Sequence, residues 1–286
     1  MRDRLRLAIP NKGRLVEPTL SLLHASGLVF EEHDRSLVSH VANQPLDILF
    51  VRTGDVVEFV ADGVADVGIT GADILAEAGR DLPIIARLGY GRCRLAVAVP
   101  SDAPVRAIED LAGQRVATSH PSITRQFFKD RNLPVEVVPL SGAVEVAPRL
   151  GLADAIVDLV STGSTLQMNG LRAIGDVLAS EAVLVADPAA QEQRPADLDS
   201  IVMMLGSVLA ARSRKYLMMN APVTHLEELE ALLPGLESPS VIPLAHAGMI
   251  AIHSVVGADE VWGLLPRLKA AGASGILVLP IEKILP

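Results

Sequence analysis

The segment DAIVDLVSTGSTLQ, residues 154–167, combines acidic and hydroxyl side chains in a way that folding alone does not require. Its first half is an apolar run that carries two carboxylates, Asp154 and Asp158. Its second half is a loop made of Ser161, Thr162, Gly163, Ser164 and Thr165. Backbone N–H groups and hydroxyls at such a loop can bind an anion, and a glycine lets the main chain approach a phosphate closely. The loop lacks a lysine and does not match GxxxxGK[ST], so it suits one compact phosphate; an ordinary Ser/Thr helix cap is the alternative.

The two carboxylates are four residues apart, which in a strand places both side chains on the same face. A buried carboxylate is costly unless it is paired, so we expect each of them to bind something. Next to a phosphate loop, Asp154 and Asp158 would accept hydrogen bonds from the hydroxyls of a phosphorylated sugar. The alternatives are a turn residue for Asp154 and a helix-capping partner for Asp158.

A second candidate is PNKGRL, residues 10–15, which also follows a predicted strand and precedes a predicted helix. Lys12 and Arg14 would place positive charge at a helix start, which the helix dipole disfavours unless an anion is bound. This favours a polyphosphate ligand. Arg35 and Arg52 belong to the same predicted domain, where each alone is typical of a solvated surface. Asp73, in VGITGAD, is equally well explained as a helix cap.

Several catalytic motifs are missing from the sequence. It contains no G-x-S-x-G motif and no metal-ligand cluster, and GYGRCR lacks the third glycine of G-x-G-x-x-G. The single cysteine, Cys93, excludes an internal disulfide. Covalent catalysis and hydride transfer therefore have no support, and a reaction driven by positioning and electrostatics fits better.

The composition narrows the class of protein further. A formal charge of -9 and 3% aromatic residues argue against a nucleic-acid surface, which requires a basic stripe and stacking rings. The longest near-continuous apolar run, residues 201–211, is about half of the roughly 20 residues that a membrane span needs. The first residues lack the apolar core of a secretory signal, so we expect a cytoplasmic protein.

The elements that position these residues follow an alternating pattern. Short runs rich in Val, Ile and Leu alternate with helix-period segments in two successive series, the second starting at CRLAVAVP, residues 93–100. This is typical of α/β units around mainly parallel strands. In the second series we expect helices at residues 106–113, 121–131 and 142–151. Ligands of open α/β sheets bind beyond the carboxyl ends of the strands, so the strand-to-helix loops are the expected site.

The pattern changes beyond residue 211. The remaining segments read as strand, helix, strand, strand, helix, strand, which is the order of the ferredoxin-like fold. These segments are residues 215–222, 224–235, 239–245, 249–256, 258–272 and 274–283. The sequence therefore predicts a separate small α+β domain over residues 212–286.

Taken together, IPNKGRL, DVGITGADIL, RVATSHP and GAVEVAPRLGLADAIVDLVSTGSTLQMNGL strongly resemble the ATP phosphoribosyltransferase family of histidine biosynthesis. The tail, with SRKYLMMNAP, LPGLESPSVIPLA and LKAAGASGILVLPIEK, resembles the regulatory domain of the long form of that family. The resemblance covers nearly the whole chain. It implies a two-lobed catalytic part similar to periplasmic binding proteins. Lobe I would comprise residues 1–94 and 180–211, lobe II residues 95–179, and the ferredoxin-like regulatory domain residues 212–286.

The resemblance also implies an activity. The 5-phosphoribosyl group of 5-phosphoribosyl 1-diphosphate would be transferred to N1 of ATP with release of diphosphate, which is the first step of L-histidine biosynthesis. Mg²⁺ would be held mainly through the diphosphate rather than by a protein-only site. L-histidine would inhibit the enzyme by feedback, and homodimers would assemble into a homohexamer.

Roles for residues follow from the same resemblance. The 5-phosphate would bind Ser161, Thr162, Gly163, Ser164 and Thr165. The ribose would contact Asp154 and Asp158, with Glu145 nearby. The departing diphosphate would be held by Lys12, Arg14 and Arg35, with Arg52 as a further candidate. The ATP side would comprise Arg52, Asp73, Arg92 and His120. Histidine would bind near Asn220, Ser238, Ser240 and Gly275, although some relatives carry an acidic residue where this chain has Asn220.

Two other functions stay open at this point. One is a non-catalytic binding module, a two-lobed α/β protein that holds a small anionic metabolite. The other is a phosphoribosyltransferase that uses a different base as nucleophile. An assay of diphosphate release with ATP and with other bases would separate these three hypotheses.

Overall fold

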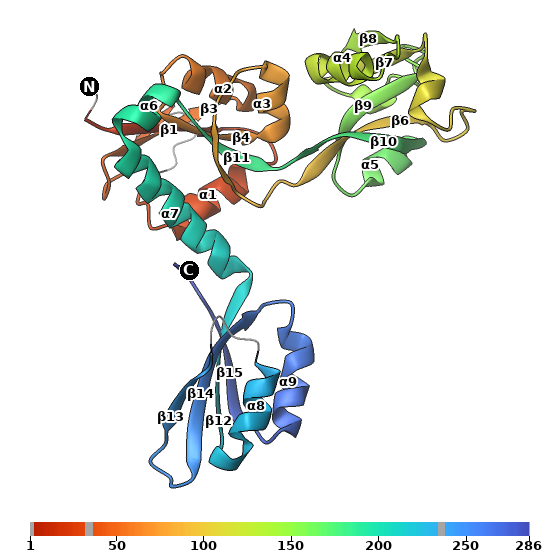
Figure 1. The fold of residues 1–286 in the computed structure, drawn as a ribbon. Helices are drawn as coiled ribbons and strands as arrows, with labels where there is room; N and C mark the ends of the chain where they lie inside the picture. The colour runs from red at the N-terminus through yellow and green to blue at the C-terminus, as the bar shows by residue number, and fades with distance from the viewer. Residues whose placement is uncertain (1–2, 32–36, 234–237, 286) are drawn as a thin grey trace. The chain divides into compact units, whose positions relative to one another are not determined.

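The computed structural model describes residues 3–31, 37–233 and 238–285. Their strands form three sheets, of six, five and four strands (Figure 1). By their contacts, residues 1–24 and 28–199 form one compact unit with the first two sheets, and residues 25–27 and 200–286 form a second unit with the third sheet. The predicted lobe boundaries are finer than this division and stay a prediction. In the part of the chain that the structure describes, no helix is long and apolar enough to span a bilayer.

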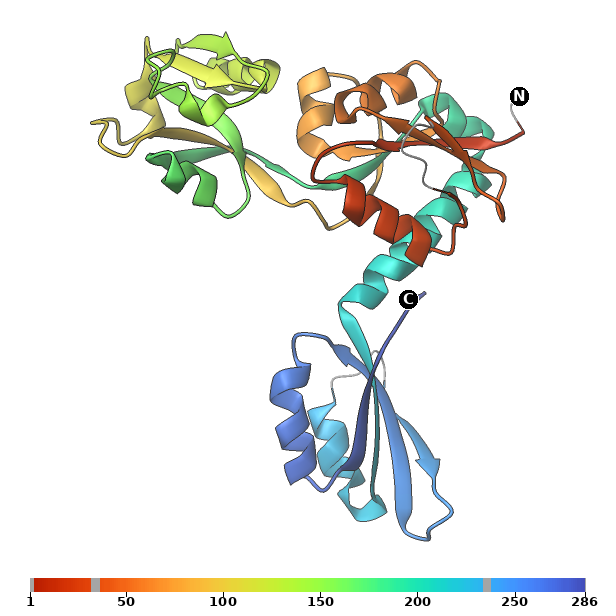
Figure 2. The same ribbon diagram turned by 180° about the vertical axis from the view of Figure 1, so that it is seen from behind.

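The first sheet has parallel strands at its centre. β1 pairs in parallel with β3 and β4, while β2, β11 and β5 add antiparallel pairs. Helices α2 and α3 lie on one face and α1 on the other (Figures 1 and 2), which explains why the strands are apolar almost throughout. In spatial order the strands are β2 (Val38–His40), β3 (Leu46–Val51), β1 (Leu5–Pro10), β4 (Val67–Gly71), β11 (Ala182–Ala186) and β5 (Ile84–Arg87). The helices are α1 (Val16–Ala25), α2 (Thr53–Ala61) and α3 (Ala72–Ala78).

The second sheet is also covered on both faces. Val97 of β6 joins a core with Phe128 of α4, whereas its neighbour Ala98 faces the other side, with Leu166 of α5. This alternation follows from the two-residue repeat of a strand. In spatial order the strands are β10 (Leu171–Ser180), β6 (Cys93–Pro100), β9 (Ala155–Val160), β7 (Arg115–Thr118) and β8 (Glu136–Pro139). The helices are α4 (Pro121–Asp130) and α5 (Ser164–Met168).

The chain crosses between these two sheets twice. It leaves the first sheet after β5 and enters the second at β6, and it returns between β10 and β11. Glu181, on the return crossing, lies 3.2 Å from Arg87 Nη1 and 3.6 Å from Arg92 Nε on the outward one. A double crossing between two α/β sheets is the connectivity of the two-lobed architecture that the sequence analysis predicts. The α/β fold class is therefore confirmed.

Some predicted elements are wrong. Residues 106–113 and 142–151 were expected to be helices, but only short 3₁₀ turns form there, η1 (Ile108–Leu111) and η2 (Val144–Val146). In the first, the Asp110 side chain accepts hydrogen bonds from the backbone N–H groups of Arg106 and Ala107, which competes with helix formation. In the second, Pro148 cannot donate the backbone bond that a continuing helix needs. The strands β10 and β11 were not predicted individually, and their antiparallel pairing makes the first two sheets mixed rather than mainly parallel.

The third sheet carries the predicted ferredoxin-like order. Its elements follow the chain as strand, helix, strand, strand, helix, strand, and all neighbouring strands are antiparallel. Both helices lie on one face of the sheet (Figure 2), packed on Leu217, Met219 and Ile252. In spatial order the strands are β13 (Ser240–Pro243), β14 (Met249–Gly257), β12 (Arg214–Pro222) and β15 (Ser274–Pro280). The helices are α8 (Leu226–Leu232), preceded by η3 (Val223–His225), and α9 (Val261–Ala270). Between β11 and β12 the chain forms α6 (Pro188–Gln193) and α7 (Pro195–Arg212).

Candidate functional site

Four predicted site residues gather at one edge of the first sheet. Because β1, β3 and β4 are parallel, the loops after them lie at the same edge. Lys12 and Arg14 follow β1, Arg52 follows β3 as the residue that begins α2, and Asp73 follows β4. Lys12, Arg14 and Arg52 are exposed, whereas Asp73 is buried. Three cations thus border this edge, which suits an anionic ligand.

The corresponding edge of the second sheet carries the hydroxyl loop. β7 and β9 are parallel, so His120, after β7, and loop 161–165, after β9, lie at one edge. β6 runs antiparallel to β9 and starts at this edge, which places Arg92 there as well. The Arg92 side chain is 77% exposed and available to a ligand. The first and second sheets therefore each carry predicted site residues at their carboxyl edges.

Loop 161–165 has the open geometry that an anion site needs. Gly163 adopts a φ of +85°, in the left-handed region that glycine occupies at little cost. The hydroxyls of Thr162 and Ser164 lie 3.0 Å apart and share a hydrogen bond. Ser161, Thr162, Ser164 and Thr165 are all exposed. Their hydroxyls are thus presented on one short loop, in reach of a single phosphate.

Asp158 lies on β9, close to this loop, in a setting that resists ionisation. Burial raises the pKa of the Asp158 carboxyl, and the charge of Glu145 in η2 raises it further. The backbone N–H of Leu159 donates to Asp158 Oδ1 at 2.8 Å and opposes the shift only in part. Asp158, with the Glu145 carboxylate near it, is well suited to accept hydrogen bonds from ligand hydroxyls or to share a cation with Glu145.

Asp154 has different surroundings from Asp158. It precedes β9, so about 13 Å of strand separates it from Asp158 at 3.3 Å per residue. Arg115 binds it through the backbone N–H at 2.9 Å, Nε at 3.3 Å and Nη2 at 3.2 Å. These bonds lower the pKa of Asp154. Asp154 thus lies at the end of β9 away from the hydroxyl loop and is paired with Arg115, while the contact of both carboxylates with one sugar stays a prediction.

Asp73 and His120 meet in a buried cluster. Asp73 Oδ2 lies 3.5 Å from His120 Nε2, and Asp73 Oδ1 accepts a hydrogen bond from Ser180 Oγ at 2.5 Å. Arg14 Nη2 lies 3.7 Å from the same carboxylate, while Arg14 Nη1 donates to the Gly91 carbonyl at 2.9 Å. Burial alone would raise the pKa of Asp73, but the nearby His120 side chain, the hydrogen bond from Ser180 and the charge of Arg14 outweigh it and lower the pKa. Asp73 is therefore an ionised anchor for Arg14.

One predicted residue cannot be placed, and three residues of the site were not predicted. Arg35 lies outside the described residues. Sequence reasoning missed Ser180 and Gly91, the partners of Asp73 and Arg14, and it also missed Glu181. Ser180 and Glu181 form a polar break between two apolar strand segments, which was the available signal. Gly91 gave none, because it acts through its backbone carbonyl.

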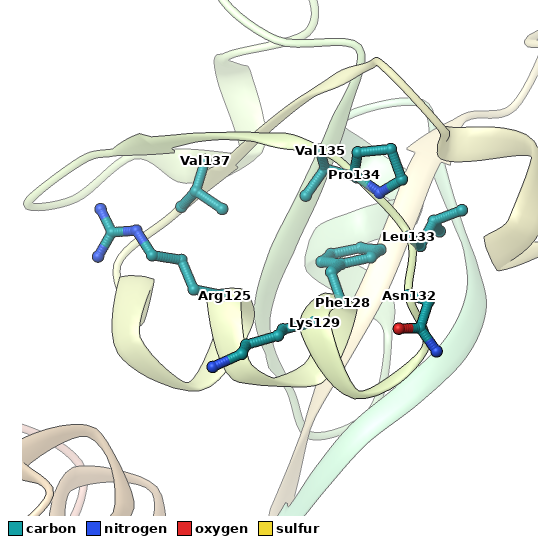
Figure 3. A pocket seen from close by; sticks show the side chains of 8 residues that line it. All are labelled: Arg125, Phe128, Lys129, Asn132, Leu133, Pro134, Val135 and Val137. Carbon is teal, nitrogen blue, oxygen red and sulfur yellow. The ribbon is translucent and has the colours of Figure 1, made fainter.

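A cavity of about 410 Å³ lies elsewhere on the second sheet. Figure 3 shows Phe128 pointing from α4 toward Pro134 and Val135. Its lining residues are Arg125, Phe128, Lys129, Asn132, Leu133, Pro134, Val135 and Val137. None of these is a predicted site residue, and the cavity lies toward the end of α4 opposite His120. It is therefore separate from the candidate site.

The predicted histidine-binding residues do not all meet within one copy of the chain. A Cβ on Gly275 would lie 3.5 Å from Asn220 Nδ2, so these two are neighbours on β15 and β12. Ser240 is on β13, two strands away from β12, and pairs with His253. Ser238 is exposed just before β13. Asn220 with Gly275, and Ser238 with Ser240, thus form two separate groups.

Within residues 3–31, 37–233 and 238–285, no group of three or more His, Cys, Asp or Glu side chains is arranged to hold a metal ion.

Two family models and several relatives match this chain. The family model described as ATP phosphoribosyltransferase matches residues 52–207, and the model described as HisG, C-terminal domain, matches residues 211–283. The ATP phosphoribosyltransferase of Gemmatimonas aurantiaca is 48% identical over 292 residues, covering 99% of this chain and 100% of that protein. That of Cytophaga hutchinsonii is 43% identical over 280 residues, with 98% of each chain covered.

A solved structure agrees with these relatives. The chain is similar to the ATP phosphoribosyl transferase (HisG:HisZ) complex from Thermotoga maritima, with a TM-score of 0.64 and 30% identity, covering 72% of this chain and 98% of that one. On these grounds the chain belongs to the ATP phosphoribosyltransferase family, a family of pentosyltransferases of histidine biosynthesis.

Proposed function

We propose that this chain transfers the 5-phosphoribosyl group of 5-phosphoribosyl 1-diphosphate to N1 of ATP, releases diphosphate and forms 1-(5-phosphoribosyl)-ATP. This is the first step of L-histidine biosynthesis. The observation that carries the proposal is the combination of family membership with an exposed hydroxyl loop, 161–165, whose strand carries a buried carboxylate, Asp158. The cations at the edge of the first sheet supply the complementary charge.

Each part of the two substrates has side chains in this protein that suit it. The 5-phosphate binds loop 161–165 through hydroxyls and backbone N–H groups. The ribose hydroxyls donate to Asp158 and Glu145, and Asp154 is left out of the site because Arg115 occupies it. The diphosphate is held by Lys12 and Arg14, with Arg35 as the third predicted cation. ATP binds at Arg52 and Arg92, with the buried pair Asp73 and His120 as the other predicted residues on its side of the site.

The reaction requires no protein nucleophile. The bond from the anomeric carbon to the diphosphate oxygen breaks, the diphosphate leaves with the bonding electrons, and N1 of adenine forms the new bond. Loss of one proton from the adenine amino group then restores neutrality of the ring. The chain contributes alignment of N1 with the anomeric carbon and stabilisation of the charge on the leaving group.

Mg²⁺ fits the donor set at this site. Mg²⁺ sites in proteins commonly combine one or two carboxylates with substrate phosphates, and Asp158 with Glu145 provides two such carboxylates. When bound, Mg²⁺ would neutralise part of the diphosphate charge. Lys12 and Arg14 would act on the same group by direct hydrogen bonds.

Regulation and assembly are proposed from the C-terminal domain. We infer that the domain binds L-histidine as a feedback inhibitor and that homodimers assemble into a homohexamer in the cytoplasm. The family-model match to the C-terminal domain supports this. So does the separation of Asn220 and Gly275 from Ser238 and Ser240, because two partial groups suit a ligand held between copies of the chain.

The test is an assay of diphosphate release with 5-phosphoribosyl 1-diphosphate, Mg²⁺ and one base at a time. We expect release with ATP, together with a product whose mass equals ATP plus the phosphoribosyl group. Release with adenine or orotate instead of ATP would indicate a different phosphoribosyltransferase. No release with any base would favour the binding module.

A further inference from the structure

Two hydrogen bonds join α3, beside the first sheet, to α4, on the second. The Glu77 carboxylate of α3 accepts from the backbone N–H of Ser122 at 2.8 Å through Oε1 and from that of Ile123 at 3.0 Å through Oε2. Both donors belong to the first turn of α4. One side chain of the first sheet's layer therefore caps a helix of the second.

Helix α4 lacks a cap of its own. Its N-cap residue, His120, makes no side-chain capping bond, and its first residue, Pro121, has no N–H. The N–H of Thr124 already donates to the His120 carbonyl. Ser122 and Ile123 thus carry the two N–H groups of the first turn that need an acceptor, and Glu77 supplies both. A carboxylate at this end of a helix is also favoured by the helix dipole.

A second contact joins the same two elements. Asp73 and Glu77 are four residues apart on α3 and so share a face of the helix. Asp73 lies 3.5 Å from His120, which immediately precedes α4. Asp73 also follows β4, and His120 follows β7, at the two carboxyl edges that carry the candidate site. The contacts from Asp73 and Glu77 therefore connect the carboxyl edge of the first sheet to the carboxyl edge of the second.

We propose that Glu77 is a positioning residue. It holds the carboxyl edges of the first and second sheets at the distance from each other that phosphoribosyl transfer requires. It holds the start of α4, and with it the neighbouring strands β7 and β9, against the layer that carries Lys12 and Arg14. Substrates then bind a preformed site instead of having to assemble it. This inference rests on the proposed function.

The proposal predicts a specific kinetic pattern. Without the Glu77 carboxylate, the binding-competent arrangement is less populated, and the apparent affinity of every ligand that spans both edges falls by that fraction. We expect Glu77→Ala to raise KM about fivefold for ATP and for 5-phosphoribosyl 1-diphosphate alike, the change that loss of one helix-end charge interaction gives. The turnover number at saturation should change less than twofold, because bound substrates restore the arrangement.

Two further variants separate positioning from simple stabilisation. Glu77→Gln keeps an oxygen that can accept one of the two N–H groups, so its KM values should lie between those of the wild type and Glu77→Ala. Glu58→Ala is the matched control: it removes a carboxylate of α2 whose partner, Arg80, follows α3 and so also lies beside the first sheet. We expect unchanged KM values for this control, even if its thermal stability falls as much as that of Glu77→Ala.

Hydrogen exchange tests the contact independently of activity. The backbone N–H groups of Ser122 and Ile123 should exchange at least about fivefold faster in Glu77→Ala than in the wild type, with the core strands unchanged. Equal exchange, or unchanged KM values despite faster exchange, would overturn the proposal. A wild type that releases no diphosphate would instead refute the proposed function, while the exchange experiment would still decide whether Glu77 fastens α4.

Discussion

Asp154 and Asp158 have the same side chain on the same segment, yet their surroundings give them opposite properties. Burial and Glu145 raise the pKa of Asp158, whereas bonds from Arg115 lower that of Asp154. A carboxylate that is partly buried next to another carboxylate is available to a ligand, and one already bound by arginine is not. We therefore propose the ribose contact for Asp158 and a structural role for Asp154.

Asp158→Asn should lower kcat/KM about a hundredfold, because a neutral amide replaces a charged acceptor of ligand hydroxyls. Its melting temperature should not fall, because the raised pKa means that the buried charge costs stability at neutral pH. In the wild type, lowering the pH through the raised pKa, above the ordinary 3.8, should protonate Asp158 and reduce kcat/KM. Diphosphate release and thermal unfolding measure these effects, and wild-type kcat/KM in the variant would contradict the assignment.

Asp154→Asn should show the reverse pattern. Its folded-state pKa is lowered, so the ion pair with Arg115 stabilises the protein above the unfolded value near 3.8, and this contribution is lost as the pH falls through the lower folded value. Because the pair is about 40% exposed, we expect a loss of at most about 1 kcal/mol at pH 7. Denaturant unfolding at neutral and acidic pH checks this. A large loss of kcat/KM in Asp154→Asn would instead indicate that Asp154 contacts the substrate.

Arg14→Ala should reduce the turnover number about a hundredfold while changing the affinity for ATP little, because the guanidinium acts on charge that develops on the leaving diphosphate. Steady-state kinetics and ATP titration measure the two effects. Arg125→Ala is the control, since Arg125 is exposed on α4 and lines the separate cavity. Wild-type turnover in Arg14→Ala would refute its role.

At the level of the elements, the site depends on which strands are parallel. Parallel pairing of β1 with β3 and β4, and of β7 with β9, collects the functional loops at the carboxyl edges of two sheets. The hydroxyl loop further depends on a left-handed residue, Gly163, which carries the chain from β9 into α5. The shape of that loop is therefore set by its backbone as much as by its hydroxyls.

Gly163→Val should weaken binding of 5-phosphoribosyl 1-diphosphate at least about tenfold, because a side chain at φ +85° costs about 1 to 2 kcal/mol and the loop will move to relieve it. A Cβ there would meet nothing closer than Val160 Cγ1 at 4.0 Å, so the effect is backbone strain and not a clash. Gly113→Val is the control, with φ +75° in a turn before β7. Isothermal titration distinguishes them, and equal affinity in all three proteins would contradict a phosphate-binding role for the loop.

At the scale of the whole molecule, the contacts within the chain divide it into two compact units, residues 1–24 with 28–199 and residues 25–27 with 200–286. The proposed regulation requires histidine to bind one unit and alter the other. The full chain should therefore bind L-histidine in isothermal titration at or below millimolar concentration, and histidine should reduce diphosphate release. Introducing an acidic side chain with Asn220→Asp should tighten binding, because a carboxylate pairs with the amino group of the ligand. No heat at millimolar histidine would refute retained regulation.

Much of this architecture could be predicted from the sequence. The hydrophobic periodicity gave most strands and helices correctly, including the βαββαβ order of the C-terminal domain, because local pattern reports which face of each element is buried. It failed at residues 106–113 and 142–151, where the Asp110 side chain and Pro148 compete with helix formation. It also left β10 and β11 unassigned. Their antiparallel pairing partners lie far away in the sequence, where no local pattern reports them.

The sequence by itself determined the chemistry that is available: the hydroxyl loop, the nearby carboxylates, the cations after β1 and the family to which these motifs belong. Only the tertiary structure decided which of those groups can act together. It placed Asp154 against Arg115, anchored Arg14 on Asp73 and the Gly91 carbonyl, and joined α3 to α4 through Glu77. The physical reason is that burial and long-range partners set whether a charged group is free, and those partners are 39 residues away for Asp154 and 45 for Glu77.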